Sequence, residues 1–217
     1  MIDVLSCPYC GDESFHNQIP GRDWFECDCG MIYKAYRKTE EELAEFYRTS
    51  QYHDSRGISS IKQDALERNR AKRIVKHLPI GGERMLDIGC ARGYLLQFAR
   101  NRGYRVLGVE PSEGHSFEEI PVVHDLDNVR GKFDVIACIH TLEHVIDFKH
   151  VIERIKELLT DKGLVLIEVP SLNSSGVYVD AHLYIFKPTI LQKLFEPLRN
   201  DLLKFTPHTF MTFRRDK

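Results

Sequence analysis

Residues 86–93, with the sequence Leu-Asp-Ile-Gly-Cys-Ala-Arg-Gly, decide the fold because they join a buried strand to a helix through a glycine-containing turn. The apolar stretch 84–90 predicts the strand, and 94–102 predicts a helix that Gly103 ends. Glycines at such a turn let the backbone approach a ligand closely, and the helix N-terminus adds free N–H groups. Asp87 contributes a carboxylate at the same point. The segment therefore predicts a ligand-binding edge at the end of the first strand of a sheet.

The glycine spacing separates this turn from two common nucleotide motifs. Gly89 and Gly93 lack the third glycine of a dinucleotide fingerprint, and no Gly-Lys-Ser/Thr of a phosphate-binding loop follows. About 20 residues later, a second predicted strand at 105–109 ends in Glu110. A carboxylate at that position accepts hydrogen bonds from both hydroxyls of a ribose. A purely structural turn would account for the glycines but not for the acid at this distance.

Strands and helices alternate through the remaining chain. Further strands are expected at 122–124, 133–140, 163–169, 202–205 and 209–213, the last two as a terminal hairpin, and further helices at 39–47, 61–77, 148–159 and 188–195. Thr39 and Glu42 form a capping-box pattern at the start of the first of these helices. Near-continuous apolar strands between helices predict an α/β fold with a doubly wound, mostly parallel, seven-stranded sheet.

Four of the six cysteines lie in the turn-rich first 29 residues. Cys7-x2-Cys10 and Cys27-x-Cys29 are two close pairs of the kind that hold tetrahedral zinc, and we do not expect disulfides in a reducing compartment. Four thiolate ligands leave no position for water, so this zinc would be structural. His16 is the nearby alternative ligand. Unligated cysteines in a loop-rich arm are the alternative to a metal site. We expect a zinc ribbon-like module at 1–38, a helical linker or cap at 39–80, and the α/β domain at 81–217.

Composition excludes several classes of protein. The 30 basic and 32 acidic side chains give a formal net charge of −2, which provides no global attraction to nucleic acid or membrane. No apolar stretch approaches the roughly 20 residues that span a bilayer. Residues 1–10 lack the pattern of a secretory signal, so we expect a cytoplasmic protein without a membrane partner.

Five segments, taken in order, resemble the motif series of class I S-adenosylmethionine-dependent methyltransferases. They are LDIGCARGYLL, VLGVEPS, HDLDN, FDVIACIHTLEHVIDF and LLTDKGLVLIEVPS, within residues 84–171. The resemblance implies a Rossmann-like methyltransferase domain with S-adenosylmethionine as methyl donor. The cofactor-binding residues that it implies are Asp87, Gly89, Cys90, Gly93, Glu110, Pro111, Asp125, Leu126 and His140. By the same resemblance, Asp87 borders the methionine part, Glu110 binds the ribose, and Asp125 with Leu126 lies against the adenine.

Three histidines are the catalytic candidates. Methyl transfer to oxygen or nitrogen needs positioning and a base, and His140 stands at the end of the fourth strand, where ligands bind in such folds. An ordinary polar strand-end residue is the alternative. Glu143-His144 resembles the acid–histidine pair of many relatives; in the ubiquinone-pathway O-methyltransferases a similar cluster holds a divalent metal, and here His140 replaces its first acid. His182, after the fifth strand, is expected to reach the substrate pocket. Tyr52 and His53, in the linker, are candidates to close over the cofactor.

The expected acceptor is a small molecule or a carrier-linked sugar. A cysteine module before this domain resembles the sugar C-methyltransferases and their uncharacterised relatives, and the slightly acidic charge agrees with a small acceptor. An RNA methyltransferase, with the zinc module binding RNA, is the first alternative, supported by the cluster Arg68, Arg70, Lys72 and Arg73. A cofactor-binding scaffold without activity is the second, and oligomeric state is left open.

Overall fold

The computed structural model describes residues 2–13, 17–48, 60–112, 119–174, 176–204 and 207–215. Tyr52 and His53, which we considered from the sequence as a cover over the cofactor, lie outside these residues. His16, the alternative ligand for the cysteine module, also lies outside them.

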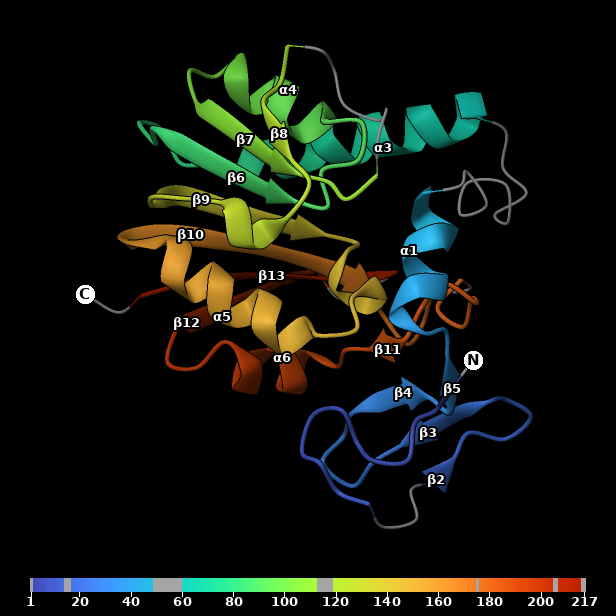
Figure 1. Ribbon diagram of the computed structural model, residues 1–217. Coiled ribbons are helices and arrows are strands. Elements are labelled where there is room, and N and C mark those ends of the chain that lie inside the picture. The colour runs from blue at the N-terminus through green and yellow to red at the C-terminus, as the bar shows by residue number, and fades with distance from the viewer. Residues whose placement is uncertain are drawn as a thin grey trace.

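A seven-stranded sheet forms the centre of the molecule (Figure 1). Its strands, in order across the sheet, are β12 (Arg199–Lys204), β13 (His208–Arg214), β10 (Leu159–Pro170), β9 (Phe133–Ile139), β6 (Arg84–Ile88), β7 (Arg105–Val109) and β8 (Val122–Val123). The five strands from β10 to β8 pair in parallel, whereas β13 pairs antiparallel with β10 and with β12. The predicted seven-stranded, mostly parallel sheet and its terminal hairpin are confirmed.

Alternate residues of the central strands enter two different apolar clusters, one on each face of the sheet. Met85 and Val135 pack with α3 (Ser60–Ile74) and α4 (Tyr94–Arg100), while Leu86 and Ile136 pack with α5 (Phe148–Leu158). This alternation follows from the two-residue period of a strand. Because both faces are covered, both sets of side chains are apolar, and the strands appear in the sequence as continuous apolar stretches.

The helices begin and end close to their predicted positions. In α1 (Glu40–Arg48) the capping box is present: Thr39 N donates to Glu42 Oε2 at 2.9 Å, and Glu42 N donates to Thr39 Oγ1 at 3.2 Å. The predicted helix at 61–77 is α3 followed by a 3₁₀ turn, η1 (Val75–His77). Two more 3₁₀ turns, η2 (Leu126–Asn128) and η3 (Leu142–His144), and α6 (Pro188–Leu194) complete the helical elements that the structure describes. None of the described helices has both the length and the apolarity to cross a membrane.

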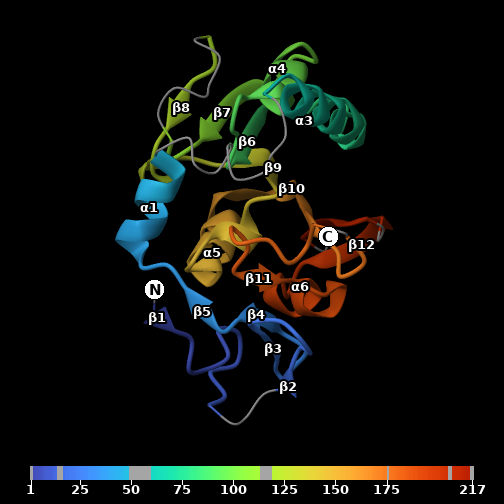
Figure 2. The same ribbon diagram turned by 90° about the vertical axis from the view of Figure 1, so that its right-hand side faces the viewer.

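A strand from near the end of the chain completes the small N-terminal sheet. This sheet has the order β11 (Tyr184–Ile185), β4 (Ile32–Lys34), β3 (Trp24–Glu26) and β2 (Asn17–Gln18), and β1 (Ile2–Asp3) pairs separately with β5 (Tyr36–Arg37). β11 and β4 are antiparallel, and Lys34 N donates to Leu183 O at 3.0 Å. Figure 2 shows β11 beside β4 below the large sheet. The sequence did not predict this strand, because two residues carry no detectable periodicity.

Candidate functional site

A pocket opens where β6 ends, between the glycine turn and α3. Its lining includes the predicted cofactor-binding residues Asp87, Gly89, Cys90 and Gly93. The opposite wall consists of Glu67, Arg70, Ala71 and Ile74 of α3, and Ala91, Arg92, Tyr94, Leu95 and Ile139 complete the lining. The structure therefore brings the first motif together with a helix for which the sequence assigned no role at the site.

Asp87 is a buried carboxylate, 4% exposed, that faces this pocket. Among the described residues, no hydrogen-bond donor contacts it. Burial, reinforced by the negative charge of Glu110, raises the pKa of Asp87 to about 8. A buried carboxylate without a partner is costly, and a positively charged ligand group placed against it would remove that cost. The pocket is therefore suited to a cationic group.

The backbone of the turn explains why two of its positions are small. Gly89 has φ +73°, and a Cβ built there would lie 2.1 Å from Thr141 Oγ1, so a side chain would collide with the loop after β9. Ala91 also has a left-handed φ, +46°, which favours glycine. Gly93, at φ +77°, is the residue that begins α4.

Glu110 is held by local hydrogen bonds. Its carboxylate accepts from Ala91 N at 2.9 Å, and from Ser112 N at 3.1 Å and Ser112 Oγ at 2.7 Å. It thus links the glycine turn to the end of β7. Any ribose bound by Glu110 would replace some of these donors.

The remaining predicted cofactor contacts lie outside the lining of this pocket. Asp125 is exposed and caps η2, where Oδ1 accepts from Asp127 N at 2.9 Å, while Leu126 is 9% exposed. Pro111 is exposed just after β7. These positions follow β7, which pairs with β6, and β8, which pairs with β7, and both pairings are parallel, so they lie at the same edge of the sheet.

His140 lies between two buried carboxylates. Its Nε2 is 3.2 Å from Glu168 Oε1, and its Nδ1 is 3.3 Å from Glu143 Oε1. Its backbone has φ +53°, which is rare outside glycine, and His140 N donates to Glu168 O at 2.7 Å. The ring also stacks edge-on against His208, with centroids 4.6 Å apart. Both ring nitrogens of His140 thus face a carboxylate.

Glu168 connects this histidine to α3. The carboxylate is fully buried and accepts from Arg73 Nη2 at 2.6 and 2.8 Å, and Arg70 Nε lies 3.6 Å away. Burial opposes ionisation, but His140 and Arg73 outweigh it and lower the pKa of Glu168 to about 2. The sequence interpretation missed this network, although a glutamate inside the apolar strand Leu-Val-Leu-Ile-Glu-Val-Pro was its visible signal.

Glu143, His144 and His182 form a second buried group. Their ligand-type atoms all lie within 4.8 Å of one another, so the set can hold a metal ion, with His182 in place of the predicted His140. His144 Nδ1 contacts Ala181 O at 2.8 Å, and His182 Nδ1 contacts Val177 O at 2.7 Å. Burial, the largest effect, lowers the pKa of His144 to about 4, so the ring is neutral at pH 7. Hydrogen bonds from Nδ1 to these carbonyls place the lone pair of a neutral ring on Nε2.

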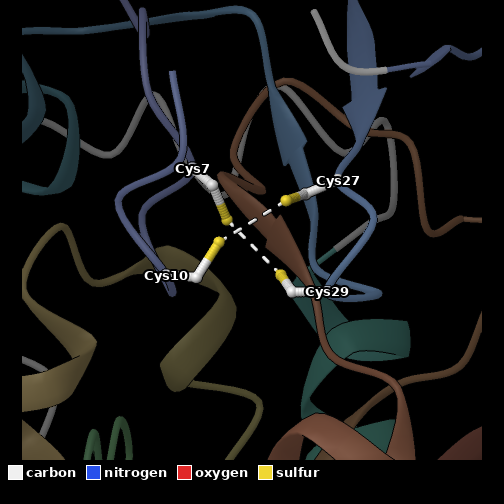
Figure 3. Close-up of side chains that lie close together, drawn as sticks. All are labelled: Cys7, Cys10, Cys27 and Cys29. Atoms are coloured by element: carbon white, nitrogen blue, oxygen red, sulfur yellow. Dashed lines mark hydrogen bonds between the residues drawn. The ribbon is translucent and has the colours of Figure 1, made fainter. Parts of the chain in front are cut away.

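The four N-terminal cysteines converge on one point (Figure 3). Cys7 Sγ and Cys29 Sγ are 3.7 Å apart, and Cys10 Sγ and Cys27 Sγ are 3.6 Å apart. Tetrahedral zinc with Zn–S bonds of about 2.3 Å places sulfur atoms about 3.8 Å apart. The cluster is therefore consistent with a metal site, as the sequence predicted.

Comparison with known proteins gives partial matches to curated enzymes. The chain is 30% identical over 118 residues to a ubiquinone biosynthesis O-methyltransferase of Chromobacterium violaceum. The matched region covers 48% of this chain and 51% of the relative. A protein of the same description from Bradyrhizobium diazoefficiens is 29% identical over 108 residues, covering 43% and 42%. The chain thus spans about half the length of the curated relatives that it matches.

Solved structures share the fold at low sequence identity. A magnesium protoporphyrin IX methyltransferase from Synechocystis PCC 6803 with bound SAH has a TM-score of 0.61 at 15% identity, covering 82% of this chain and all of that one. The 1,6-didemethyltoxoflavin-N1-methyltransferase of Burkholderia thailandensis has a TM-score of 0.63 at 21% identity, covering 90% and 100%. The family model described as "Methyltransferase domain" matches residues 50–206. The chain therefore belongs to this methyltransferase-domain family.

Proposed function

We propose that this protein transfers a methyl group from S-adenosylmethionine to a small-molecule acceptor. The observation that carries the proposal is the buried carboxylate of Asp87 in the pocket at the end of β6, with no hydrogen-bond donor on it among the described residues. S-adenosylmethionine carries positive charge on its sulfonium and ammonium groups. Either group would provide the positively charged partner that the Asp87 carboxylate lacks. The chain's membership of the methyltransferase-domain family supports the same donor. So do several structural relatives that are described as dependent on S-adenosylmethionine or as binding it.

The residues around the pocket have distinct proposed roles. Asp87 stabilises the positive charge of the methionine part, and Gly89, Cys90 and Gly93 let the backbone approach it. Glu110 and Pro111, followed by Asp125 and Leu126, hold the nucleoside along the edge of the sheet. When bound, S-adenosylmethionine supplies an electrophilic methyl group, so this chain need only orient the acceptor, exclude water and receive a proton.

The histidine–carboxylate group lies on the acceptor side in this proposal. His140 touches a carboxylate through each ring nitrogen, which suits an electrostatic and orienting role better than proton acceptance. His144 is neutral at pH 7, and its Nδ1 contact with Ala181 leaves the lone pair on Nε2, so we assign proton acceptance to this nitrogen. His182, whose Nδ1 contact is of the same kind, orients the acceptor beside it. Replacing His144 with Gln is therefore expected to lower kcat while leaving S-adenosylmethionine binding unchanged.

Zinc is the metal that we propose for the cysteine cluster. Four thiolates at tetrahedral spacing leave no position for water, so the ion would hold the module together without entering the reaction. The proposed acceptor class is a small molecule or a carrier-linked sugar. Relatives whose names give small molecules as substrates support the first of these.

Calorimetric titration of the purified protein with S-adenosylmethionine tests the proposal. We expect micromolar binding that Asp87→Asn weakens by about 10- to 100-fold, because a charge-assisted contact is lost. Asp161→Asn is the matched control. It removes an exposed acid on β10, outside the pocket lining, and should leave binding unchanged. Binding that survives Asp87→Asn would contradict the site, and binding without turnover on any acceptor would favour the scaffold alternative.

RNA methylation is less well supported by the side-chain contacts. Arg70 and Arg73, two members of the basic cluster, point to Glu168 and contribute to the protein interior. Only Arg68 and Lys72 of that cluster are left as exposed charges on α3. Salt-dependent RNA binding with a steep slope would reverse this conclusion.

A further inference from the structure

A second pocket lies where the cysteine module, α1 and the loop before β11 meet. Its lining comprises Lys34, Tyr36, Arg37, Lys38, Leu43, Phe46, Asp180, Ala181 and Leu183. β5 leads directly from the module into α1 (Figure 2), and residues of both elements line the pocket. The pocket thus belongs to neither the cysteine cluster nor the cofactor site.

The lining is positively charged. Three cations and one carboxylate leave a net charge of +2. Lys34 Nζ is paired with Asp180 Oδ1 at 2.9 Å. Arg37 Nη1 is buried and has no hydrogen-bond partner among the residues that the structure describes. Lys38 Nζ lies 5.2 Å from the centre of the Phe46 ring, and no described carboxylate forms an ion pair with it.

A buried guanidinium nitrogen without an acceptor requires an explanation, because an unsatisfied charged donor is costly in a folded protein. An oxyanion would satisfy Arg37 with the paired N–H geometry that a guanidinium offers. A phosphate monoester carries about −1.5 to −2 at pH 7, which matches the charge of the lining, whereas a carboxylate carries only −1. Phe46 and Tyr36 add an aromatic wall for the rest of such a ligand.

The pocket is connected to the proposed acceptor side. Leu183 N donates to Glu143 O at 2.8 Å, and His144 Nδ1 contacts Ala181 O at 2.8 Å, so two wall residues hold the backbone and ring of the histidine–carboxylate group. A ligand bound in the pocket would therefore contact the residues that position Glu143 and His144.

We infer that this pocket binds a phosphate monoester group of the methyl acceptor, with Arg37 and Lys38 as its ligands. As an acceptor subsite the inference rests on the proposed function, but the binding itself does not. It also gives the cysteine module a role, because Lys34, Tyr36 and Arg37 reach the pocket from β4 and β5 of the module.

The test compares two titrations of the full chain. Binding of phenyl phosphate is detected by ³¹P NMR, and benzoate is titrated separately for comparison. We expect phenyl phosphate to bind at least about tenfold more tightly than benzoate, because of its second charge. Arg37→Gln should weaken phenyl phosphate binding by about tenfold or more, and Arg37→Lys by less. Lys38→Gln, at a less confined position, provides a second variant if Arg37→Gln does not fold.

Arg105→Gln removes an exposed cation at the opposite end of the parallel strands and should change nothing. Zinc content and S-adenosylmethionine affinity equal to those of the unaltered protein show that each variant is folded. Unchanged phenyl phosphate binding in both Arg37→Gln and Lys38→Gln would overturn the inference, as would equal binding of benzoate. Phosphate binding that depends on Arg37, in a protein that does not bind S-adenosylmethionine, would refute the proposed function and leave the pocket standing.

Discussion

At the scale of single residues, Asp87 shows how one side chain couples stability to ligand binding. Its raised pKa means that the folded protein keeps a proton that the unfolded chain releases near pH 4. Stability contributed by this group therefore falls as the pH rises from about 4 to about 8. A carboxylate that destabilises the ligand-free protein fits the binding role that we propose for Asp87.

Asp87→Asn is expected to raise the melting temperature of the ligand-free protein at pH 8 by about 3 °C or more, because the neutral amide avoids the cost of a buried charge. The difference from the unaltered protein should shrink towards pH 4, where both side chains are neutral in the folded state. Thermal unfolding at pH 4, 6 and 8 measures it. A variant less stable at pH 8 than the unaltered protein would contradict the raised pKa.

The same residue predicts the pH dependence of cofactor affinity. A cationic ligand lowers the pKa of Asp87, so binding below pH 8 releases a proton, and affinity should increase up to about tenfold per pH unit before it levels off above pH 8. Calorimetry at pH 6.5, 7.5 and 8.5 in two buffers with different ionisation enthalpies measures both effects. Affinity that is independent of pH, with no proton release, would show that Asp87 does not face the positive charge.

At the scale of elements, the position of α3 depends on one buried carboxylate. Glu168 is in the sheet, and Arg70 and Arg73 are on the helix that forms the far wall of the proposed cofactor pocket. The apolar contacts of α3 with the sheet come from Ala71 and Ile74, near its C-terminal end. The ion pairs therefore add directional contacts beside a short apolar patch.

Glu168→Gln is expected to lower the free energy of unfolding by about 2 kcal/mol and to weaken S-adenosylmethionine binding, because it removes the charge that both arginines and His140 contact. The low pKa of Glu168 means that its contribution is complete above about pH 4.5 and is lost as the pH falls towards 2. Urea unfolding at pH 7 and pH 3 tests both statements. Glu153→Gln, which breaks an exposed pair with Lys156, should change stability by less than about 0.5 kcal/mol.

At the scale of the whole molecule, β11 ties the cysteine module to the large domain. The strand comes from residues 184–185, just after the loop with His182, and pairs with β4 of the module. The packing is continuous as well, since Cys7, Cys27 and Tyr33 belong to the same apolar cluster as Phe186 and Ile190. Loss of the module is therefore transmitted to the proposed acceptor side.

Cys10→Ser is expected to abolish stoichiometric zinc and to lower the melting temperature of the entire chain, because the module's sheet includes β11. Mass spectrometry of the metal measures the zinc content. Near-ultraviolet circular dichroism during heating measures the thermal unfolding. Cys90→Ser, outside the cluster, should retain the metal. A fully folded, zinc-free Cys10→Ser protein would show that the cluster does not hold the fold.

The sequence alone determined the features that depend on local pattern. Apolar periodicity predicted the strands, Thr39 and Glu42 predicted the helix cap, the glycine turn with Asp87 predicted the pocket edge, and cysteine spacing predicted the cluster. The divisions at 38/39 and 80/81 and the link to sugar C-methyltransferases stay predictions.

Tertiary structure decided the contacts between residues far apart in the chain. Arg73 and Glu168 are 95 positions apart, and β4 and β11 are more than 140 apart, so no local pattern reports either pairing. The same is true of His182 beside Glu143 and of the cationic pocket around Arg37. Such contacts depend on how the sheets and helices pack, because burial, and with it the charge state of each group, exists only once the chain has folded.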